Sequence, residues 1–381
     1  QVSTPSLGPA EPTLKAKDLT DKSRPMNVKG NIVTRKLDIG KLAGIKQVGE
    51  VTLRGAVDAT LGNGNTDIRI DTLVIDKLNA LGYDYSNIRA AGTYSDDTFD
   101  GRVVCSDPNL NFLFQGIASL PGKGKDEIYK FYANVGYADL EALNIDKRGG
   151  TSKVSGEINA NYVKDGGSGE VVGDFDISGL NLQNDKGSFD IGNVSVKAHD
   201  DGGGRHSIVL DSDFADGTYT GSKPVTDLLG DLKELALRES LPVLLDGKER
   251  KWDGGEYKVD LDIHDAKDVL AYAMPGLYIA DSTRVRLDVN DEGLLTASVK
   301  SPRVAMGKNY LKDLDLKLDN RNGSLNGTAK GSEFSAGGMV LKNDNISIHA
   351  KDNQIGLGCT YDNKTEAGDK GEIFMSGELG K

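Results

Sequence analysis

The sequence has little of what catalytic and metal sites are built from. Its 381 residues include two cysteines, four histidines and one tryptophan. Neither Cys105 nor Cys359 has a histidine or a second cysteine at metal-ligand spacing, and each falls on an apolar position of a strand pattern. We therefore expect two buried, unpaired thiols and no metal site. The histidines are equally isolated, and we expect them on wet strand faces or in turns: His199, His206, His264 and His349.

Motifs for enzymatic chemistry are also missing. There is no Gly-x-Ser-x-Gly nucleophile turn and no Gly-x-x-x-x-Gly-Lys phosphate loop. Residues 288–293 begin like a calcium loop, but Val299 stands where the closing glutamate belongs, so we expect a hairpin turn. Asp211 and Asp213 share the outer face of a strand, where solvated carboxylates are poorly placed for acid–base work. We predict that the protein is not an enzyme and uses no cofactor.

Basic clusters and long apolar runs are absent from the sequence as well. The net charge is −12, and lysine and arginine are scattered. Nucleic-acid binding needs a basic stripe, so we expect no nucleic-acid partner. No run of about 18 apolar residues predicts a membrane helix, and no signal-peptide pattern is present. Because the sequence opens at Gln1 and stops at Lys381 in mid-pattern, we expect it to be an internal piece of a longer chain.

What the sequence does have is a two-residue alternation of apolar and polar side chains. It is clear in residues 51–59, 154–160, 259–263 and 314–319. Side chains of a strand point alternately to its two faces, so each segment has one apolar and one polar face. Glycine is frequent (48 residues), and Gly-containing turns between the segments favour antiparallel hairpins. The sequence predicts an elongated all-β protein whose antiparallel sheet closes on itself, pairs with a second sheet or curves into a trough.

One segment, near 224–241, has the period of an amphipathic helix. Val225, Leu228, Leu229, Leu232, Leu235 and Ala236 recur at helical spacing, and the other side holds Asp227, Asp231, Lys233, Glu234 and Arg238. We favour a helix that covers an end of the sheet over one that lies on a membrane, because its polar side is mixed in charge rather than basic.

Asp-led turns divide the strands into similar blocks. They lie at 38–42, 139–143 and 265–269, and an alternating strand follows each one. We predict a linker or partial leading strand over 1–30, β repeats over 31–120 and 121–222, the amphipathic helix and a connector over 223–256, and a third β repeat with a truncated tail over 257–381.

The apolar face of the strands is the candidate site. Packing against a second sheet is the simplest role for such a face, but many of its positions are Gly or Ala, which would leave room for an acyl chain. We expect a lipid groove lined by Val51, Leu53, Val57, Ile68, Ile70, Val103, Phe112, Phe114, Val154, Ile158, Phe175, Ile177, Val194, Val196, Ile208, Leu210, Val259, Leu261, Ile263, Val285, Leu287, Leu314, Leu316, Leu318, Ile346 and Ile348.

Several segments resemble a known family. They are Asp-Tyr-Ser-Asn-Ile at 84–88, the run from Phe99 to Phe112, Ala-Asp-Leu-Glu-Ala-Leu at 138–143, the helix ending in Ser-Leu-Pro at 240–242, Met-Pro-Gly-Leu at 274–277 and Gly-Ser-Leu-Asn-Gly at 323–327. Together they resemble the TamB family (translocation and assembly module), closest to the TamB-like proteins of Bacteroides-type bacteria within the AsmA-like group.

The resemblance implies a taco-like groove with a hydrophobic interior in a periplasmic protein of a Gram-negative envelope. It also implies phospholipid transport between the inner and outer membranes and outer-membrane biogenesis, with phospholipid acyl chains as ligand. An outer-membrane assembly barrel protein would be a partner, contacted outside this segment, and an N-terminal anchor outside it would reach the inner membrane. The family offers no catalytic residues to transfer.

Two other functions remain open from the sequence. One is a scaffold or chaperone for the assembly of outer-membrane β-barrel proteins, which would receive unfolded strands on an open sheet edge. The other is a surface adhesin made of stacked β-sandwiches.

Overall fold

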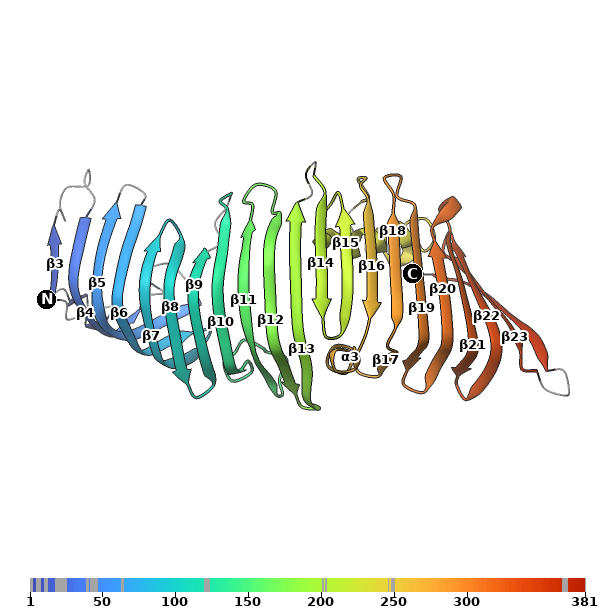
Figure 1. The fold of residues 1–381 in the computed structure, drawn as a ribbon, viewed down its shortest axis with the longest axis horizontal. Helices are drawn as coiled ribbons and strands as arrows, with labels where there is room; N and C mark the ends of the chain where they lie inside the picture. The colour runs from blue at the N-terminus through green and yellow to red at the C-terminus, as the bar shows by residue number, and fades with distance from the viewer. Residues whose placement is uncertain are drawn as a thin grey trace. The chain divides into compact units, whose positions relative to one another are not determined.

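A computed structural model describes residues 3–4, 8–9, 13–17, 26–38, 41, 47–62, 65–119, 124–200, 202, 204–245, 247, 251–364 and 369–380 (Figure 1). The chain divides into two compact units, residues 1–193 and 194–381, and strand β13 runs across the division.

Unit 1 is a meander of antiparallel strands. From β4 to β12, each strand pairs with the one before it in the chain. The strands are β1 Ser3–Thr4, β2 Gly8–Pro9, β3 Thr13–Lys17, β4 Met26–Asp38, β5 Val48–Gly62, β6 Asn65–Ala80, β7 Tyr83–Ser95, β8 Thr98–Asp107, β9 Leu110–Ser119, β10 Glu127–Asp139, β11 Ser152–Lys164, β12 Val171–Asn184 and β13 Gly187–Asp200.

Unit 2 repeats this arrangement, with helices between some of its strands. β16 pairs with β18, and the short β17 pairs with β19 beyond the end of β18. The elements are β14 His206–Ser212, β15 Ala215–Gly221, η1 Val225–Asp227, α2 Leu228–Leu237, η2 Pro242–Leu244, β16 Tyr257–Ile263, α3 Lys267–Ala273, β17 Leu277–Ile279, β18 Thr283–Val289, β19 Leu295–Met306, β20 Asn309–Asp319, η3 Arg321–Gly323, β21 Leu325–Ala336, β22 Met339–Lys351, β23 Gln354–Asp362 and β24 Lys370–Glu378.

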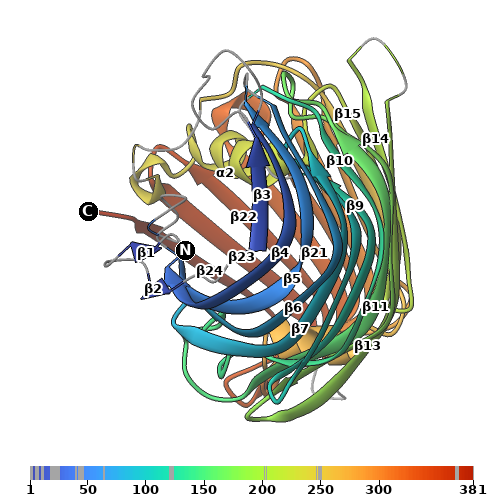
Figure 2. The same ribbon diagram turned by 90° about the vertical axis from the view of Figure 1, so that its left-hand side faces the viewer.

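The predicted fold class is confirmed: the chain is all-β, and its antiparallel strands form curved, open sheet rather than a closed barrel. Figure 2 shows that the strands within each unit bend along their length. The alternation explains the pairing, because directly opposed residues of neighbouring strands point to the same face. Every register is therefore fixed by the need to keep the apolar set on one side of the sheet.

A row of glycines allows neighbouring strands of unit 1 to approach closely. Gly92, Gly101 and Gly116 lie directly opposite one another on β7, β8 and β9. Gly92 and Gly116 have φ values of 150° and 136°, which side chains rarely allow. A Cβ atom on Gly92 would lie 2.6 Å from the Cα atom of Gly101. These glycines, expected only to leave room in a groove, are required by the close approach of neighbouring backbones.

The helix predicted near 224–241 is present as α2, preceded by the 3₁₀ turn η1. Leu228, Leu232, Leu235 and Ala236 of the predicted apolar side pack against buried residues of the sheet. Three residues depart from the prediction, because Asp231 and Glu234 are buried (0% and 1% exposed) and Leu229 is 80% exposed. A second short helix, α3, lies where the sequence predicted only an Asp-led turn at 265–269. Among the residues with described positions, no helix is long and apolar enough to cross a membrane.

Candidate functional site

The apolar face of unit 1 consists of rows of side chains that cross the strands. Opposed residues in each row come from successive strands, so the row runs across the sheet while the strands run along it. One such row is Ile32, Gly55, Leu73, Ala90, Val103, Phe114, Ala133, Ile158 and Ile177. Nine strands thus contribute one continuous apolar stripe.

Unit 2 has equivalent rows. One of them is Val196, Leu210, Gly217, Leu261, Val285, Val299, Leu316, Ala329, Ile346, Cys359 and Ile373. Cys359 therefore belongs to the apolar face, as Cys105 does in unit 1, opposite Ile88 and Phe112. Both cysteines are free thiols; Cys105 is buried and Cys359 is half-buried.

The structure places the predicted groove residues of each unit together on that unit's apolar face. Only Val51, Ile263 and Leu314 are buried, at 1%, 9% and 7% exposure. All the others are half-buried. A solid core would bury nearly all of these side chains, whereas a free surface would leave many of them exposed. Half-burial across the middle rows fits a hollow face whose side chains contact their neighbours but are not fully covered.

The opposite face of each sheet is polar and ion-paired. Cross-strand pairs include Lys29 with Asp58 (2.7 Å) in unit 1 and Arg286 with Asp260 (2.9 Å) in unit 2. These side chains are 40–76% exposed, so each pair stabilises the fold by only about 0–1 kcal/mol. Their main effect is to keep this face in water, which leaves the apolar face as the surface available to a hydrophobic ligand.

Aromatic rings gather on the apolar face of unit 1 beside the glycine row. The ring of Phe114 lies 6.1 Å from that of Phe99 and 5.1 Å from that of Phe131, centroid to centroid. Tyr129 stacks on Tyr162 at 4.8 Å. The low aromatic content of the sequence did not predict this cluster. The cluster depends on the pairing register, because each ring lies beside a glycine or alanine of a neighbouring strand.

A polar group borders these rings near the strand ends. The Tyr129 hydroxyl donates a hydrogen bond to Glu127 Oε2 (3.0 Å), and Lys164 Nζ pairs with Glu127 Oε1 (3.1 Å). Burial, together with the hydrogen bond to Glu127, raises the pKa of Tyr129 to about 12. The pKa of Glu127 is lowered by the hydrogen bonds from Lys164 and Tyr129. The Tyr129 hydroxyl is therefore a neutral donor at physiological pH.

In unit 2, α2 covers one end of the apolar face (Figure 2). Leu228, Leu232, Leu235 and Ala236 of the helix pack against a buried cluster on β15, β16, β18 and β19. The members of that cluster are Tyr219, Tyr257, Val289 and Leu295, all 1–5% exposed.

The helix is held at both of its ends. Buried Asp231 accepts hydrogen bonds from Lys223 Nζ (2.7 Å) and from the Tyr257 hydroxyl. Burial and this bond to Asp231 raise the pKa of Tyr257 far above its ordinary value, so the phenol stays a donor. Beyond the other end, Asn353 N–H donates to the Ser240 carbonyl (2.9 Å) and Asn353 Oδ1 accepts from Val243 N–H (2.9 Å). The segment from Lys223 to Val243 thus reaches from β15 and β16 to the β22–β23 turn.

The other end of the strands in unit 2 is closed by small polar contacts. Thr283 and Ser301 are 1% and 4% exposed, and their hydroxyls lie 2.6 Å apart. Thr283 also donates to the carbonyl of Ala280, just after β17. On β18 and β19, α2 covers one end of the apolar face and these polar contacts close the other, while the residues between them remain half-buried. A hydrophobic chain that fits this face would lie across the strands, along the rows.

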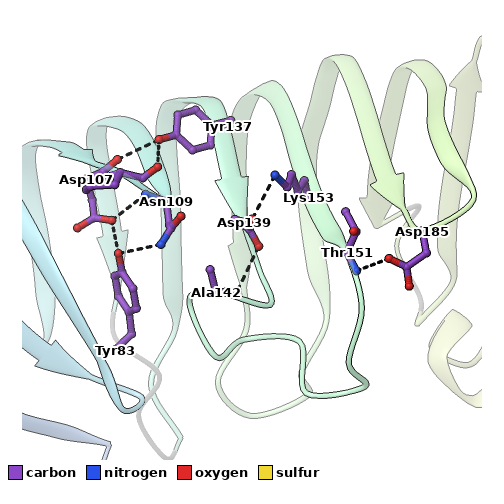
Figure 3. Close-up of polar contacts among 10 residues, drawn as sticks. Tyr83, Asp107, Asn109, Tyr137, Asp139, Ala142, Thr151, Lys153 and Asp185 are labelled. Atoms are coloured by element: carbon purple, nitrogen blue, oxygen red, sulfur yellow. Dashed lines mark hydrogen bonds and ion pairs between the residues drawn. The ribbon is translucent and has the colours of Figure 1, made fainter.

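In unit 1, aspartates fix the turns at one end of the strands (Figure 3). Asp107 is 4% exposed and accepts hydrogen bonds from Tyr83 (2.5 Å), Ser86 and the Asn109 N–H. These bonds outweigh the effect of burial and lower the pKa of Asp107. Asp139, in one of the predicted Asp-led turns, accepts from Ala142 N–H (3.1 Å). The hydrogen-bonding capacity of these carboxylates is therefore taken up by contacts that hold the turns in place.

No chemical centre accompanies these surfaces in the described residues. No group of three or more His, Cys, Asp or Glu side chains there could hold a metal ion. His264 contacts Asp216 (2.8 Å), and His349 contacts Asn326 (2.9 Å), both on the polar face. Comparison with family models, with curated proteins and with solved structures finds no match for this chain.

Proposed function

We propose that this chain is a periplasmic bridge segment of a TamB-like envelope protein, whose apolar sheet face shields phospholipid acyl chains in transit between the inner and outer membranes. The observation that supports this most is the half-burial of the aligned aliphatic rows in each unit. Each methylene moved from water onto such a face contributes about 0.8 kcal/mol. A face with many small contacts lowers the cost of moving a lipid along it without holding the acyl chains at one position.

Co-purification is the first test. Native mass spectrometry of gently purified protein should detect bound phospholipid, and delipidated protein should take up a fluorescent phospholipid. If neither occurs, this function is wrong.

Substitutions that introduce a charge on the apolar face test the same function against a matched control. Leu287 lies in the middle of β18 on this face and is half-buried. Leu287→Asp, like Leu53→Asp in unit 1, should lower lipid uptake roughly tenfold or more, because a carboxylate among acyl chains is costly to desolvate. Val209→Asp, at a 37% exposed position one residue from Ile208 on the other face, is the control and should leave uptake unchanged. Unchanged lipid uptake in a folded Leu287→Asp variant would argue against an acyl-chain face.

A second candidate, a scaffold for outer-membrane β-barrel assembly, has one observation in its favour. Strand β24 exposes Phe374 (72%) and Met375 (60%), and β23 is its only partner among the described strands. An apolar edge strand can accept another strand by backbone hydrogen bonding. A photo-crosslinker at Phe374 that captures nascent barrel proteins, combined with no lipid crosslinks on the apolar face, would favour this alternative.

A further inference from the structure

A pocket lies at the end of the apolar face of unit 2, between α2 and two hairpin turns. It has a volume of about 580 Å³ and is bordered by the second half of α2, by Trp252, and by the turns at 292–294 and 320–324. Leu235 both lines this pocket and packs on the buried cluster beneath α2. A ligand in the pocket would therefore sit beside the apolar face.

Asn320 holds the pocket open in a fixed shape. Its Nδ2 donates to the carbonyl of Leu235 on α2 (3.2 Å) and to the carbonyl of Gly293 in the first turn (2.9 Å). Its Oδ1 accepts from the N–H of Leu295 (2.9 Å). One side chain thus fixes the helix and both turns relative to one another. The walls are positioned before any ligand arrives, which reduces the ordering cost of binding.

The charges around the pocket are mixed, and most of them have no ion-pair partner among the residues that the structure describes. Glu234 is paired with Arg238 within α2. Glu239, Glu292 and Arg321 are exposed and form no ion pair with any residue that the structure describes. The Glu239 carboxylate lies over Gly323, where the missing side chain leaves it space. The pocket therefore offers two exposed carboxylates and one exposed guanidinium group, near the negative end of the α2 dipole.

This set of charges fits a ligand that has one cationic and one anionic group. A guanidinium group binds phosphate oxygens through parallel N–H donors. Carboxylates beside a helix C-terminus favour an ammonium group. A purely anionic headgroup would meet two unpaired carboxylates and one arginine, and would be repelled.

We propose that this pocket binds an amine-bearing phosphodiester, the headgroup of a zwitterionic phospholipid such as phosphatidylethanolamine, with Arg321 on the phosphate and Glu239 and Glu292 on the ammonium group. The proposal rests on the acyl-chain function above and adds headgroup selectivity to it. Acyl chains would extend from the pocket past Leu235 onto the rows of the unit 2 face.

Trp252 provides a direct readout, because it is the only tryptophan in the chain and lines the pocket. Titration of the purified protein with glycerophosphoethanolamine should change Trp252 fluorescence saturably, and glycerophosphoglycerol should bind roughly tenfold more weakly or not at all. Glu292→Gln and Arg321→Gln should each weaken the response to glycerophosphoethanolamine. Glu372→Gln, on an exposed side chain of β24, is the matched control and should leave it unchanged. Equal responses to both compounds, or none to either, would overturn the proposal.

A second arm separates a lipid headgroup from a free phosphodiester. Vesicles of phosphatidylcholine with either phosphatidylethanolamine or phosphatidylglycerol are offered to delipidated protein, and the captured lipids are quantified. We expect enrichment of phosphatidylethanolamine that Glu292→Gln abolishes. Capture of all lipids without preference would overturn headgroup recognition and leave the acyl-chain function standing. Capture of no lipid would refute that function, and with it a lipid source for the headgroup.

Discussion

At the scale of single residues, the least expected side chain is Asp344 on β22. It is 3% exposed, and neither of its carboxylate oxygens has a hydrogen-bond partner among the described residues. Gly331 lies directly opposite on β21, on the apolar side of the sheet. Burial raises the pKa of Asp344 above its ordinary value of 3.8. Folding therefore shifts the ionisation of this carboxyl toward its neutral form.

The raised pKa of Asp344 predicts the direction in which the free energy of unfolding changes with pH. Below about pH 3.8 the carboxyl is neutral in both the folded and the unfolded state, and its burial adds no ionisation cost. As the pH rises through the raised folded pKa, the unfolded state is favoured by ionisation and stability is lost. Asp344→Asn should therefore raise the free energy of unfolding by about 1–2 kcal/mol at pH 7, with the gain shrinking below pH 3.8.

Urea unfolding at pH 7 and at pH 3.5 measures this difference. Asp352→Asn is the control, because Asp352 lies exposed in the β22–β23 turn and the new residue tolerates its φ of 52°. Its effect should stay within about 0.5 kcal/mol at both pH values. A gain for Asp344→Asn that is the same at pH 3.5 as at pH 7 would show that ionisation is not the cause.

At the scale of elements, the glycine row permits the close approach of β7, β8 and β9. A methyl group at Gly92 must accept a φ of 150° and would press on the backbone of β8. Gly92→Ala should therefore destabilise the protein by about 2–3 kcal/mol. Gly377→Ala in β24 is the control, since its Cβ would meet nothing within 4 Å and the change should be within about 0.5 kcal/mol. Thermal and urea denaturation compare the two, and equal stability of both variants would show that the close approach at Gly92 does not require glycine.

The element scale also shows how far the sequence predicts this structure. The alternation predicted the strands and the face of every groove residue, because the period of two in a strand is set by local geometry alone. The packing side of α2 was predicted, but the burial of Asp231 was not, since it depends on hydrogen bonds from Lys223 before the helix and from Tyr257 on β16. The aromatic cluster and the glycine row depend on register between strands, which a single strand does not encode. The three β repeats and their bounds stay a prediction.

At the scale of the whole molecule, the two faces have very different consequences for ligand binding. The polar face holds exposed ion pairs such as Lys29 with Asp58, which salt screens within a Debye length of about 8–10 Å. The apolar faces depend on burial, which salt does not weaken in the same way. If acyl chains occupy the apolar faces, lipid should bind the folded chain and not the unfolded one.

Lipid should then stabilise the whole chain by mass action. At a free lipid concentration 100 times the Kd, the gain is about 2.7 kcal/mol, and it should persist in 0.5 M NaCl because burial of methylenes supplies it. The measurement is the thermal midpoint of delipidated protein with and without a short-chain phospholipid below its critical micelle concentration, at low and high salt. The Leu287→Asp variant should lose most of the lipid-dependent stabilisation that comes from the unit 2 face. The Val209→Asp variant should keep that stabilisation. A midpoint shift that disappears at high salt would instead indicate binding of the headgroup to surface charges, and the acyl chains would then have no role in it.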